Sequence, residues 1–286
     1  MSATTEQPLY GVLGYPVSHS RSPALHCYWL KKYAGGGVYL PLAVPPAALP
    51  VALKSLVAGG FQGFNVTIPH KEAICPLLDV LDVSAQQVGA VNTVVISHSK
   101  CKKVLTGYNT DVTGYAEGLV AGATGLKLMG ASAAIIGSGG AARAVALALK
   151  QHGVATIIFL ARNERAATAI IGDCALGAGA GVLPFSPQMP PLSVDLVVNT
   201  TPLGMKGQDA LHFPWQVLSK SCVISDCVYN PLQTTLLREA VEHGHTPVDG
   251  LGMFLGQAAV AFALWTGIKP EIDETARRLA LGQTAG

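Results

Sequence analysis

Residues 131–151 read ASAAIIGSGGAARAVALALKQ, and this stretch decides the fold. Its first part, 131–136, is an apolar run without polar alternation, which is typical of a strand buried on both faces. A glycine-rich turn at 137–140 follows directly, and an alanine-rich helix is predicted from Ala141 to Gln151. A strand, a glycine turn and a helix in this order predict one unit of a parallel, doubly wound sheet.

The glycine turn carries a dinucleotide-binding pattern. Gly137, Gly139 and Ala142 match G-x-G-x-x-G/A. The first glycine allows the tight turn, the second lets the backbone approach a pyrophosphate, and the third position keeps helix and strand close. A tight turn without a ligand would give the same short pattern. The next predicted strand, 156–160, lies at the spacing of a nucleotide-binding unit, so we predict a dinucleotide site with phosphates at the helix N-terminus.

The end of that second strand indicates which cofactor binds. NAD sites usually place Asp or Glu there for the ribose 2′-hydroxyl, whereas this chain reads ARNER at 161–165. Arg162 and Arg165 suit a 2′-phosphate, because a guanidinium pairs with phosphate oxygens bidentately. Glu164 is the one acidic residue in this stretch and argues against NADP, unless it is only an exposed partner of a neighbouring arginine. The sequence therefore predicts NADP rather than NAD.

The alternation of strands and helices continues on both sides of this unit. Downstream, apolar runs at 195–199 and 222–226 predict two more parallel strands, and the Gly- and Pro-rich stretch 172–194 predicts a variable surface connection. Pro41 predicts that its own strand lies at a sheet edge. Upstream, we expect strands at 9–13, 38–44 and 63–68, a hairpin of 90–96 with 104–108, and helices at 23–33 and 46–58.

Composition excludes several classes of protein. The chain has 286 residues, of which 50% are hydrophobic and 13% charged, so it can bury a large core in about two domains. A net charge of +2 without a long basic run argues against nucleic-acid binding. The six cysteines form no CxxC pair or zinc-like cluster, so no metal site is predicted. The absence of a secretory signal predicts a cytoplasmic protein with reduced thiols.

One uncharged stretch, 250–268, approaches the length of a membrane-spanning helix. Four of its residues are glycine and Gln257 lies within it. We therefore expect a buried core helix at 253–266 and no membrane segment.

Polar side chains follow the predicted strand ends of the first third of the chain. Lys71, in NVTIPHK at 65–71, could exchange a proton with an alcohol, although a lone lysine is more often solvated. Asp111 follows another strand end, and a Lys–Asp pair across a cleft would hold the ammonium in place. Ser20 and Ser22 precede a helix and could donate to a carboxylate, with ordinary helix capping as the alternative.

Taken together, these stretches resemble the shikimate dehydrogenase family over nearly the whole chain. Seven motifs occur in order: HSRSP at 19–23, NVTIPHK at 65–71, GAVNT at 89–93, NTD at 109–111, GSGGAAR at 137–143, DCVYNP at 226–231 and DGLGM at 249–253. Seven ordered motifs are far more specific than any one of them.

The resemblance implies an α/β fold of two domains. An N-terminal α/β substrate domain would comprise 1–110 and 250–286, with C-terminal helices that return to it, and a Rossmann-type doubly wound domain, 111–249, would bind NADP. The implied activity is the reversible NADP-dependent reduction of 3-dehydroshikimate to shikimate, a step of the shikimate pathway to chorismate and the aromatic amino acids. The implied partner is this small-molecule substrate, with a monomer or homodimer as the working form.

The resemblance also assigns roles by position. Lys71 would be the acid/base residue of the hydride transfer, paired with Asp111. The residues that would hold the substrate are Ser20, Ser22, Thr67, Asn92, Asp111, Tyr229 and Gln257. The residues that would contact the cofactor are Gly137, Ser138, Gly139, Gly140, Ala141, Arg162, Asn163, Arg165, Thr201, Cys227 and Gly250.

This chain differs from the family pattern at three points. Arg165 comes one residue earlier than the family's second basic position, Cys227 replaces a bulkier residue of some members, and His70 varies within the family, so we interpret it as structural. Two alternatives stay open: a quinate/shikimate dehydrogenase that uses NAD or both cofactors, and a non-catalytic Rossmann protein that senses the cofactor. The presence of both Lys71 and Asp111 argues against the second.

Overall fold

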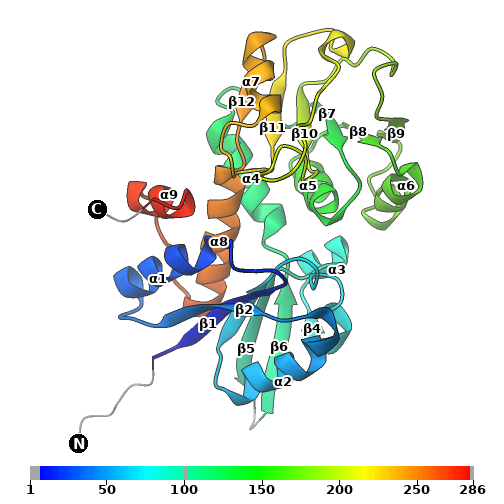
Figure 1. Cartoon of the computed structure of the whole chain (residues 1–286). Coiled ribbons are helices and arrows are strands. Elements are labelled where there is room, and N and C mark those ends of the chain that lie inside the picture. The colour runs from blue at the N-terminus through cyan, green and yellow to red at the C-terminus, as the bar shows by residue number, and fades with distance from the viewer. Residues whose placement is uncertain (1–6, 100–101, 284–286) are drawn as a thin grey trace, which may run out of the picture. The chain divides into compact units, whose positions relative to one another are not determined.

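The structure is a computed structural model that describes residues 7–99 and 102–283 (Figure 1). The chain forms two compact units. The first comprises Met1–Thr110 and Ala258–Gly286, and the second comprises Asp111–Gln257. The second boundary thus lies inside helix α8 (Leu251–Thr266) and not at residue 249.

The first unit is built on a six-stranded mixed sheet in the order β2-β1-β3-β5-β6-β4. Its strands are β1 (Leu9–Gly14), β2 (Val38–Ala43), β3 (Gly63–Val66), β4 (Val80–Leu81), β5 (Thr93–Ser99) and β6 (Lys102–Tyr108). The predicted edge position of β2 is confirmed, where Pro41 needs no ladder hydrogen bond. The strand predicted to reach residue 68 ends at Val66, because the backbone N–H of His70 bonds Thr67 O and turns the chain.

The predicted hairpin is confirmed, but β5 starts and ends three residues later than predicted, and β6 starts two residues earlier. β5 pairs antiparallel with β6, with Thr93 opposite Tyr108 and Ser99 opposite Lys102. Residues 100–101, within the predicted connection of this hairpin, lie outside the described residues.

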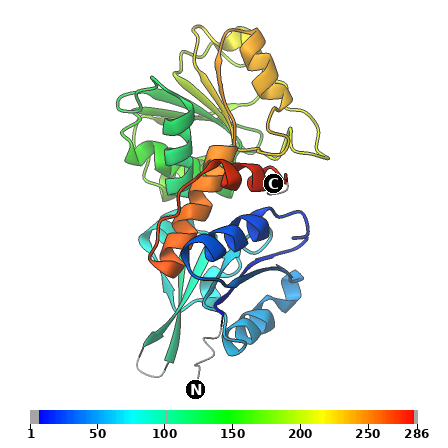
Figure 2. The same ribbon diagram turned by 90° about the vertical axis from the view of Figure 1, so that its left-hand side faces the viewer.

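Helices cover both faces of this sheet (Figure 2). Leu49 and Leu53 of α2 pack with Leu13 and Phe64 in one buried cluster. On the opposite face, Trp265 of α8 stacks on Tyr10 with ring centroids 5.0 Å apart. The helices confined to this unit are α1 (Ser22–Tyr33), α2 (Leu49–Ala58), α3 (Val83–Val88) and α9 (Glu274–Ala280), and short 3₁₀ turns lie at Pro46–Ala48 and Cys75–Leu77.

A buried histidine lies among the aromatic side chains on the side of the sheet where α8 packs, which we call the aromatic face. The His26 ring is fully buried and stacks on Tyr39 with centroids 4.5 Å apart, between Trp29 and Trp265. Within the described part of the chain, neither ring nitrogen has a hydrogen-bond partner. Burial without a compensating partner disfavours the imidazolium and lowers the pKa of His26 from 6.5 to about 3.

This histidine makes the first unit sensitive to acid. Between pH 6.5 and about 3, the unfolded chain binds a proton at His26 that the folded chain does not. The free energy of unfolding should therefore fall as the pH drops through this window, by up to about 1.4 kcal/mol per pH unit. Urea titrations at several pH values should show that His26→Phe removes this part of the slope. Replacing the exposed His98 with Phe is the control, and equal slopes for His26→Phe and wild type would contradict the expectation.

The second unit contains a six-stranded sheet in the order β12-β11-β10-β7-β8-β9, and all its strand pairs are parallel. Its strands are β7 (Ser132–Ile136), β8 (Thr156–Ala161), β9 (Ala180–Pro184), β10 (Leu196–Asn199), β11 (Val223–Asp226) and β12 (Thr246–Val248). The chain runs outward from β7 through β8 to β9, then returns to β10 on the other side of β7. This reversal of strand order confirms the doubly wound sheet and marks a switch point where ligands bind.

The stretch 172–194 was wrongly expected to be only a surface connection. It contains β9, which pairs with β8 at the edge of the sheet. This short strand is half-buried and ends in proline, so it shows neither the alternation nor the apolar run of a central strand.

The remaining helices belong to the second unit or begin in it. They are α4 (Asp111–Gly122), α5 (Gly140–Gln151), α6 (Glu164–Asp173), α7 (Thr235–Glu242) and α8, and a 3₁₀ turn lies at Trp215–Val217. The backbones of α4 and α8 touch, because a Cβ on Gly118 would lie 2.5 Å from the carbonyl carbon of Gly252. The expected core helix at 253–266 is confirmed as α8. Among the described residues, no helix has the length and apolar character needed to cross a bilayer.

Candidate active site

A pocket of about 520 Å³ lies at the carboxyl ends of β7, β8 and β10. Six of the sequence-predicted cofactor residues line it: Gly137, Ser138, Gly139, Arg162, Asn163 and Thr201. The rest of the lining is mostly apolar and comprises Ile136, Leu160, Phe185, Thr200, Pro202, Leu203 and Leu211. The second unit therefore brings the glycine turn and the basic strand end into one cavity.

The first glycine of the turn is required by the fold. Gly137 has φ +112°, a backbone conformation that other residues rarely adopt. A Cβ there would also lie 2.8 Å from Thr200 Oγ1, whose hydroxyl donates to Ile136 O at 2.6 Å. The turn after β7 thus packs directly against the loop after β10.

Folding does not require the other two glycines of the turn. A Cβ built on Gly139 or Gly140 would have no atom within 4 Å, and Gly139 has an ordinary φ of −96°. Gly139 is also the N-cap of α5, and no side chain caps this helix. Bare backbone at an uncapped helix N-terminus fits the close approach of a pyrophosphate, which accepts the N–H groups left unpaired there.

Gly139→Ala is therefore expected to weaken NADP binding without destabilising the chain. The added methyl group has room in the protein but would stand where the pyrophosphate meets the backbone. The dissociation constant for NADP should rise by about tenfold or more, while the melting temperature stays within about 2 °C of wild type. Titration calorimetry and thermal melts measure both quantities. A lower melting temperature with unchanged affinity would show that the glycine serves folding instead.

The three predicted cofactor residues after β8 differ in position. Arg162 is exposed and lines the pocket. Asn163 also lines it and caps α6, since its Oδ1 accepts the N–H of Ala166 at 3.0 Å. Arg165 lies in the first turn of α6, outside the pocket lining. Glu164 is exposed, and no ion pair involves it in the described part of the chain.

Two further predicted cofactor residues touch each other. A Cβ on Gly250 would lie 2.5 Å from Cys227 O, so only glycine allows this close approach. Burial raises the pKa of the Cys227 thiol far above its usual value, and the carboxylates of Asp226 and Asp111 add to the effect. The thiol is therefore uncharged near neutral pH, and neither Cys227 nor Gly250 belongs to the pocket lining.

A buried hydrogen-bond network places one of the predicted substrate residues of the first unit. Asn92 Oδ1 accepts from the backbone N–H and the hydroxyl of Thr110 at 2.8 and 3.1 Å. The hydroxyl of Thr93 donates to the same oxygen at 3.0 Å. Asn65 donates to Thr93 Oγ1 at 3.0 Å and accepts the Tyr39 hydroxyl at 2.6 Å. These bonds lock the Asn92 amide in one orientation, with Asn65 and Tyr39 as supports that were not predicted.

The other predicted substrate residues of this unit lie around strand ends and the start of α1. Ser20 Oγ accepts the N–H of Ser22 at 3.3 Å, but the N-cap of α1 is Arg21 and carries no side-chain cap. Thr67 and Lys71 follow β3, where Lys71 O accepts the N–H of Val91 at 2.8 Å. This bond brings the NVTIPHK and GAVNT segments together.

His70 has the structural role expected of it. Its ring is buried, and its Nε2 lies 2.7 Å from Val44 O.

Asp111, Tyr229 and Gln257 belong to the second unit. Asp111 is the first residue of α4 and is almost fully buried. Tyr229 stacks on Phe254 with ring centroids 4.4 Å apart, and Gln257 Nε2 donates to Phe254 O at 2.9 Å. Phe254 thus supports both side chains, and nothing in the sequence pattern had singled it out.

Comparisons with known proteins agree with these features. Residues 12–94 match the shikimate dehydrogenase substrate binding domain, and residues 250–279 match the shikimate 5'-dehydrogenase C-terminal domain. A shikimate dehydrogenase (NADP(+)) from Paramagnetospirillum magneticum is 43% identical over 96% of this chain and 98% of its own length.

Solved structures of similar fold cover 96% of the chain. Shikimate 5-dehydrogenase from Thermus thermophilus, in complex with NADP(H) and shikimate, has a TM-score of 0.82 at 36% identity and is covered over 99% of its length. Quinate dehydrogenase from Corynebacterium glutamicum, in complex with NAD, has a TM-score of 0.84 at 32% identity, also with 99% covered. With two glycines left bare at a helix N-terminus, a basic residue in the same pocket and this likeness over nearly its full length, the chain belongs to the shikimate dehydrogenase family.

Proposed function

We propose that this chain catalyses the reversible, NADP-dependent reduction of 3-dehydroshikimate to shikimate. The observation that carries the proposal is the nucleotide pocket, where bare backbone at Gly139 and the guanidinium of Arg162 line one cavity. The first suits a pyrophosphate and the second a 2′-phosphate.

In this proposal the second unit binds and orients the cofactor. When bound, NADPH supplies the hydride for the ring carbonyl. The N–H groups at the start of α5 hold the pyrophosphate, and Arg162 pairs with the 2′-phosphate. The rest of the cofactor is bordered by Asn163, Thr201, Cys227 and Gly250.

The side chains assigned to the substrate hold the ring. Ser20 and Ser22 donate hydroxyl hydrogen bonds to its carboxylate, and Asn92, Asp111 and Gln257 bond its hydroxyl groups, with Thr67 and Tyr229 beside them. Lys71 Nζ gives a proton to the oxygen of the reduced carbonyl, and it takes the proton back in the reverse direction. Asp111 is the partner of Lys71 in this proton transfer.

A nicotinamide-absorbance assay of the purified chain tests the function directly. Shikimate and quinate are each supplied with NADP and with NAD. Turnover confined to shikimate with NADP is expected. Comparable turnover of quinate, or with NAD, would contradict the assigned substrate or cofactor. Absence of turnover in all four mixtures would favour the alternative of a non-catalytic protein that senses the cofactor.

This reaction belongs to the shikimate pathway, which leads to chorismate and the aromatic amino acids. We expect the enzyme to work in the cytoplasm, where thiols such as the buried Cys174 and Cys222 stay reduced.

A further inference from the structure

Two buried polar side chains end the neighbouring strands β10 and β11. Asn199 and Asp226 are register partners in this parallel pair, and both are almost completely buried. Asn199 Nδ2 donates to Asp226 Oδ1 at 2.9 Å. Buried polar groups persist only where hydrogen bonds satisfy them, so their further partners indicate what the pair holds.

Asn199 holds the loop that follows β10. Its Oδ1 accepts the backbone N–H and the hydroxyl of Thr201 at 2.9 and 2.8 Å, and its Nδ2 also donates to Leu203 O at 3.2 Å. Thr201 and Leu203 line the nucleotide pocket. One buried amide therefore uses its full hydrogen-bonding capacity to shape one wall of that pocket.

Asp226 holds the loop that follows β11. Its Oδ1 accepts the N–H of Val228 at 3.0 Å, and its Oδ2 accepts the hydroxyl of Thr234 at 2.7 Å. Thr234 is the buried N-cap of α7, so the far end of the network is anchored in a helix. The loop between them carries Cys227 and Tyr229.

We propose that Asn199 and Asp226 are positioning residues for the NADP site, which together hold the loops after β10 and β11 against the glycine turn. The inference rests on the proposed binding of NADP in the second unit. Neither side chain lines the pocket, so both act through the loops they bond. Burial also raises the pKa of Asp226 to about 6, so the charged and neutral forms of this carboxyl differ little in free energy near neutral pH. A neutral amide of the same shape is therefore a fair substitute.

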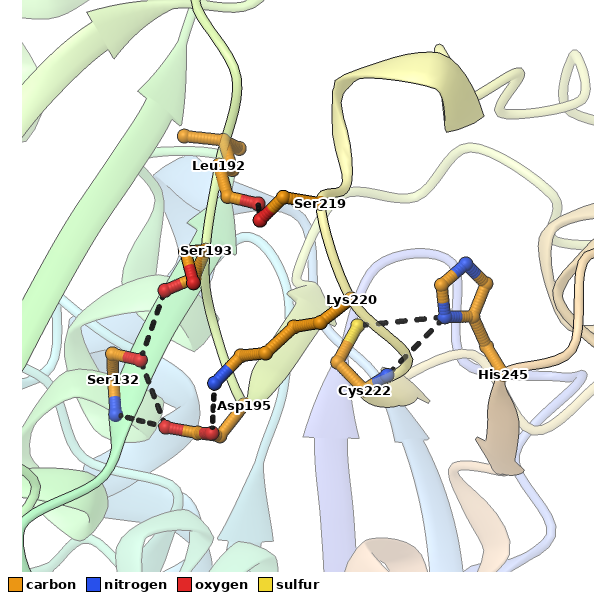
Figure 3. Close-up of polar contacts among 8 residues, drawn as sticks. All are labelled: Ser132, Leu192, Ser193, Asp195, Ser219, Lys220, Cys222 and His245. Carbon is orange, nitrogen blue, oxygen red and sulfur yellow. Dashed lines mark hydrogen bonds and ion pairs between the residues drawn. The ribbon is translucent and has the colours of Figure 1, made fainter.

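The same sheet offers a matched control at its opposite end. Asp195 precedes β10 and, like Asp226, accepts hydrogen bonds from three side-chain or backbone donors (Figure 3). They are the N–H and hydroxyl of Ser132 at 2.9 and 2.8 Å, and Lys220 Nζ at 2.6 Å. These bonds join the amino-terminal ends of β7, β10 and β11, away from the pocket. Asp195→Ala should therefore lower stability and leave the affinity for NADP unchanged.

The test measures NADP⁺ binding by titration calorimetry. For Asp226→Ala we expect the dissociation constant to rise about tenfold to hundredfold at a stoichiometry near one. A merely structural role would instead lower the stoichiometry and the melting temperature at constant affinity. Asp226→Asn should restore the affinity to within about threefold of wild type, because it keeps Oδ1 for Asn199 and Val228, and the Thr234 hydroxyl can accept from the new amide.

Thr234→Val keeps the proposal testable where Asp226→Ala fails to fold. It removes the bond to Asp226 at the outer end of the network together with the side-chain cap of α7, and leaves the bonds of Asn199 in place, so the dissociation constant should rise in the same direction by a smaller factor. Wild-type affinity in folded Asp226→Ala, or in Thr234→Val where that variant alone folds, would overturn the proposal. Because binding needs no turnover, a chain that binds NADP⁺ but does not oxidise shikimate refutes the proposed substrate and still decides this question.

Discussion

Replacing Lys71 with alanine is expected to lower kcat for shikimate oxidation by about 10²- to 10⁴-fold. The KM for shikimate should change far less, because proton transfer by Nζ is needed in the transition state and the carboxylate and hydroxyl contacts of the ring remain. Steady-state kinetics at saturating NADP⁺ measure both constants. This is the largest single effect that we expect from one side chain.

Two comparisons separate proton transfer from charge and from general damage. Lys71→Arg keeps the positive charge but cannot release a proton near neutral pH, so it should remain slow. Lys54→Ala removes an exposed lysine of α2 in the same unit and should behave as wild type. A fast Lys71→Arg variant would mean that charge alone is required. A fast Lys71→Ala variant would remove Lys71 from the reaction.

Replacing Arg162 with alanine is expected to reduce the preference for NADP over NAD by about tenfold to hundredfold. A charge-assisted bond to a phosphate contributes about 1.5–3 kcal/mol, and each 1.4 kcal/mol is a factor of ten in affinity. The loss should appear in the KM for NADP and leave the KM for NAD almost unchanged, because NAD has no 2′-phosphate for the guanidinium to bind.

Arg165→Ala is the matched control for this charge. Arg165 is also exposed, only three positions further on, but it lies outside the pocket lining. We expect a smaller change in cofactor preference than for Arg162→Ala. Equal effects of the two substitutions would show that the site senses the summed positive charge of the α6 N-terminus instead of one paired guanidinium.

The elements that could be predicted from the sequence are those whose local pattern matches their environment. The run at 131–136 is apolar because β7 has a neighbouring strand on each side and helices on both faces. Its burial can therefore be predicted from its composition. β9 has no such signature. It is an edge strand with a glycine in it and a proline at its end, and only pairing with β8 makes it a strand.

The candidate site divides in the same way. Glycines at a turn and basic residues at a strand end indicate a phosphate-binding site, because few other roles require these residues there. The supports of the site carry no such signal. Tyr39 of β2 meets Asn65 of β3 although β1 lies between these two strands in the sheet, and Phe254 is one apolar residue among many in α8. Their roles exist only in the folded contacts, so periodicity and spacing could not reveal them.

The division of the chain at 110 and 257 also determines the order in which the units can fold during synthesis. Residues 111–257 are one unbroken segment, so the nucleotide-binding unit has all its strands once this segment leaves the ribosome. The first unit must wait for its last residues, since Trp265 donates to Val94 O at 3.0 Å and Asp273 accepts the Tyr28 hydroxyl at 2.6 Å. We therefore expect the unit that begins second to finish first, while the aromatic face around His26 stays open to chaperones until translation ends.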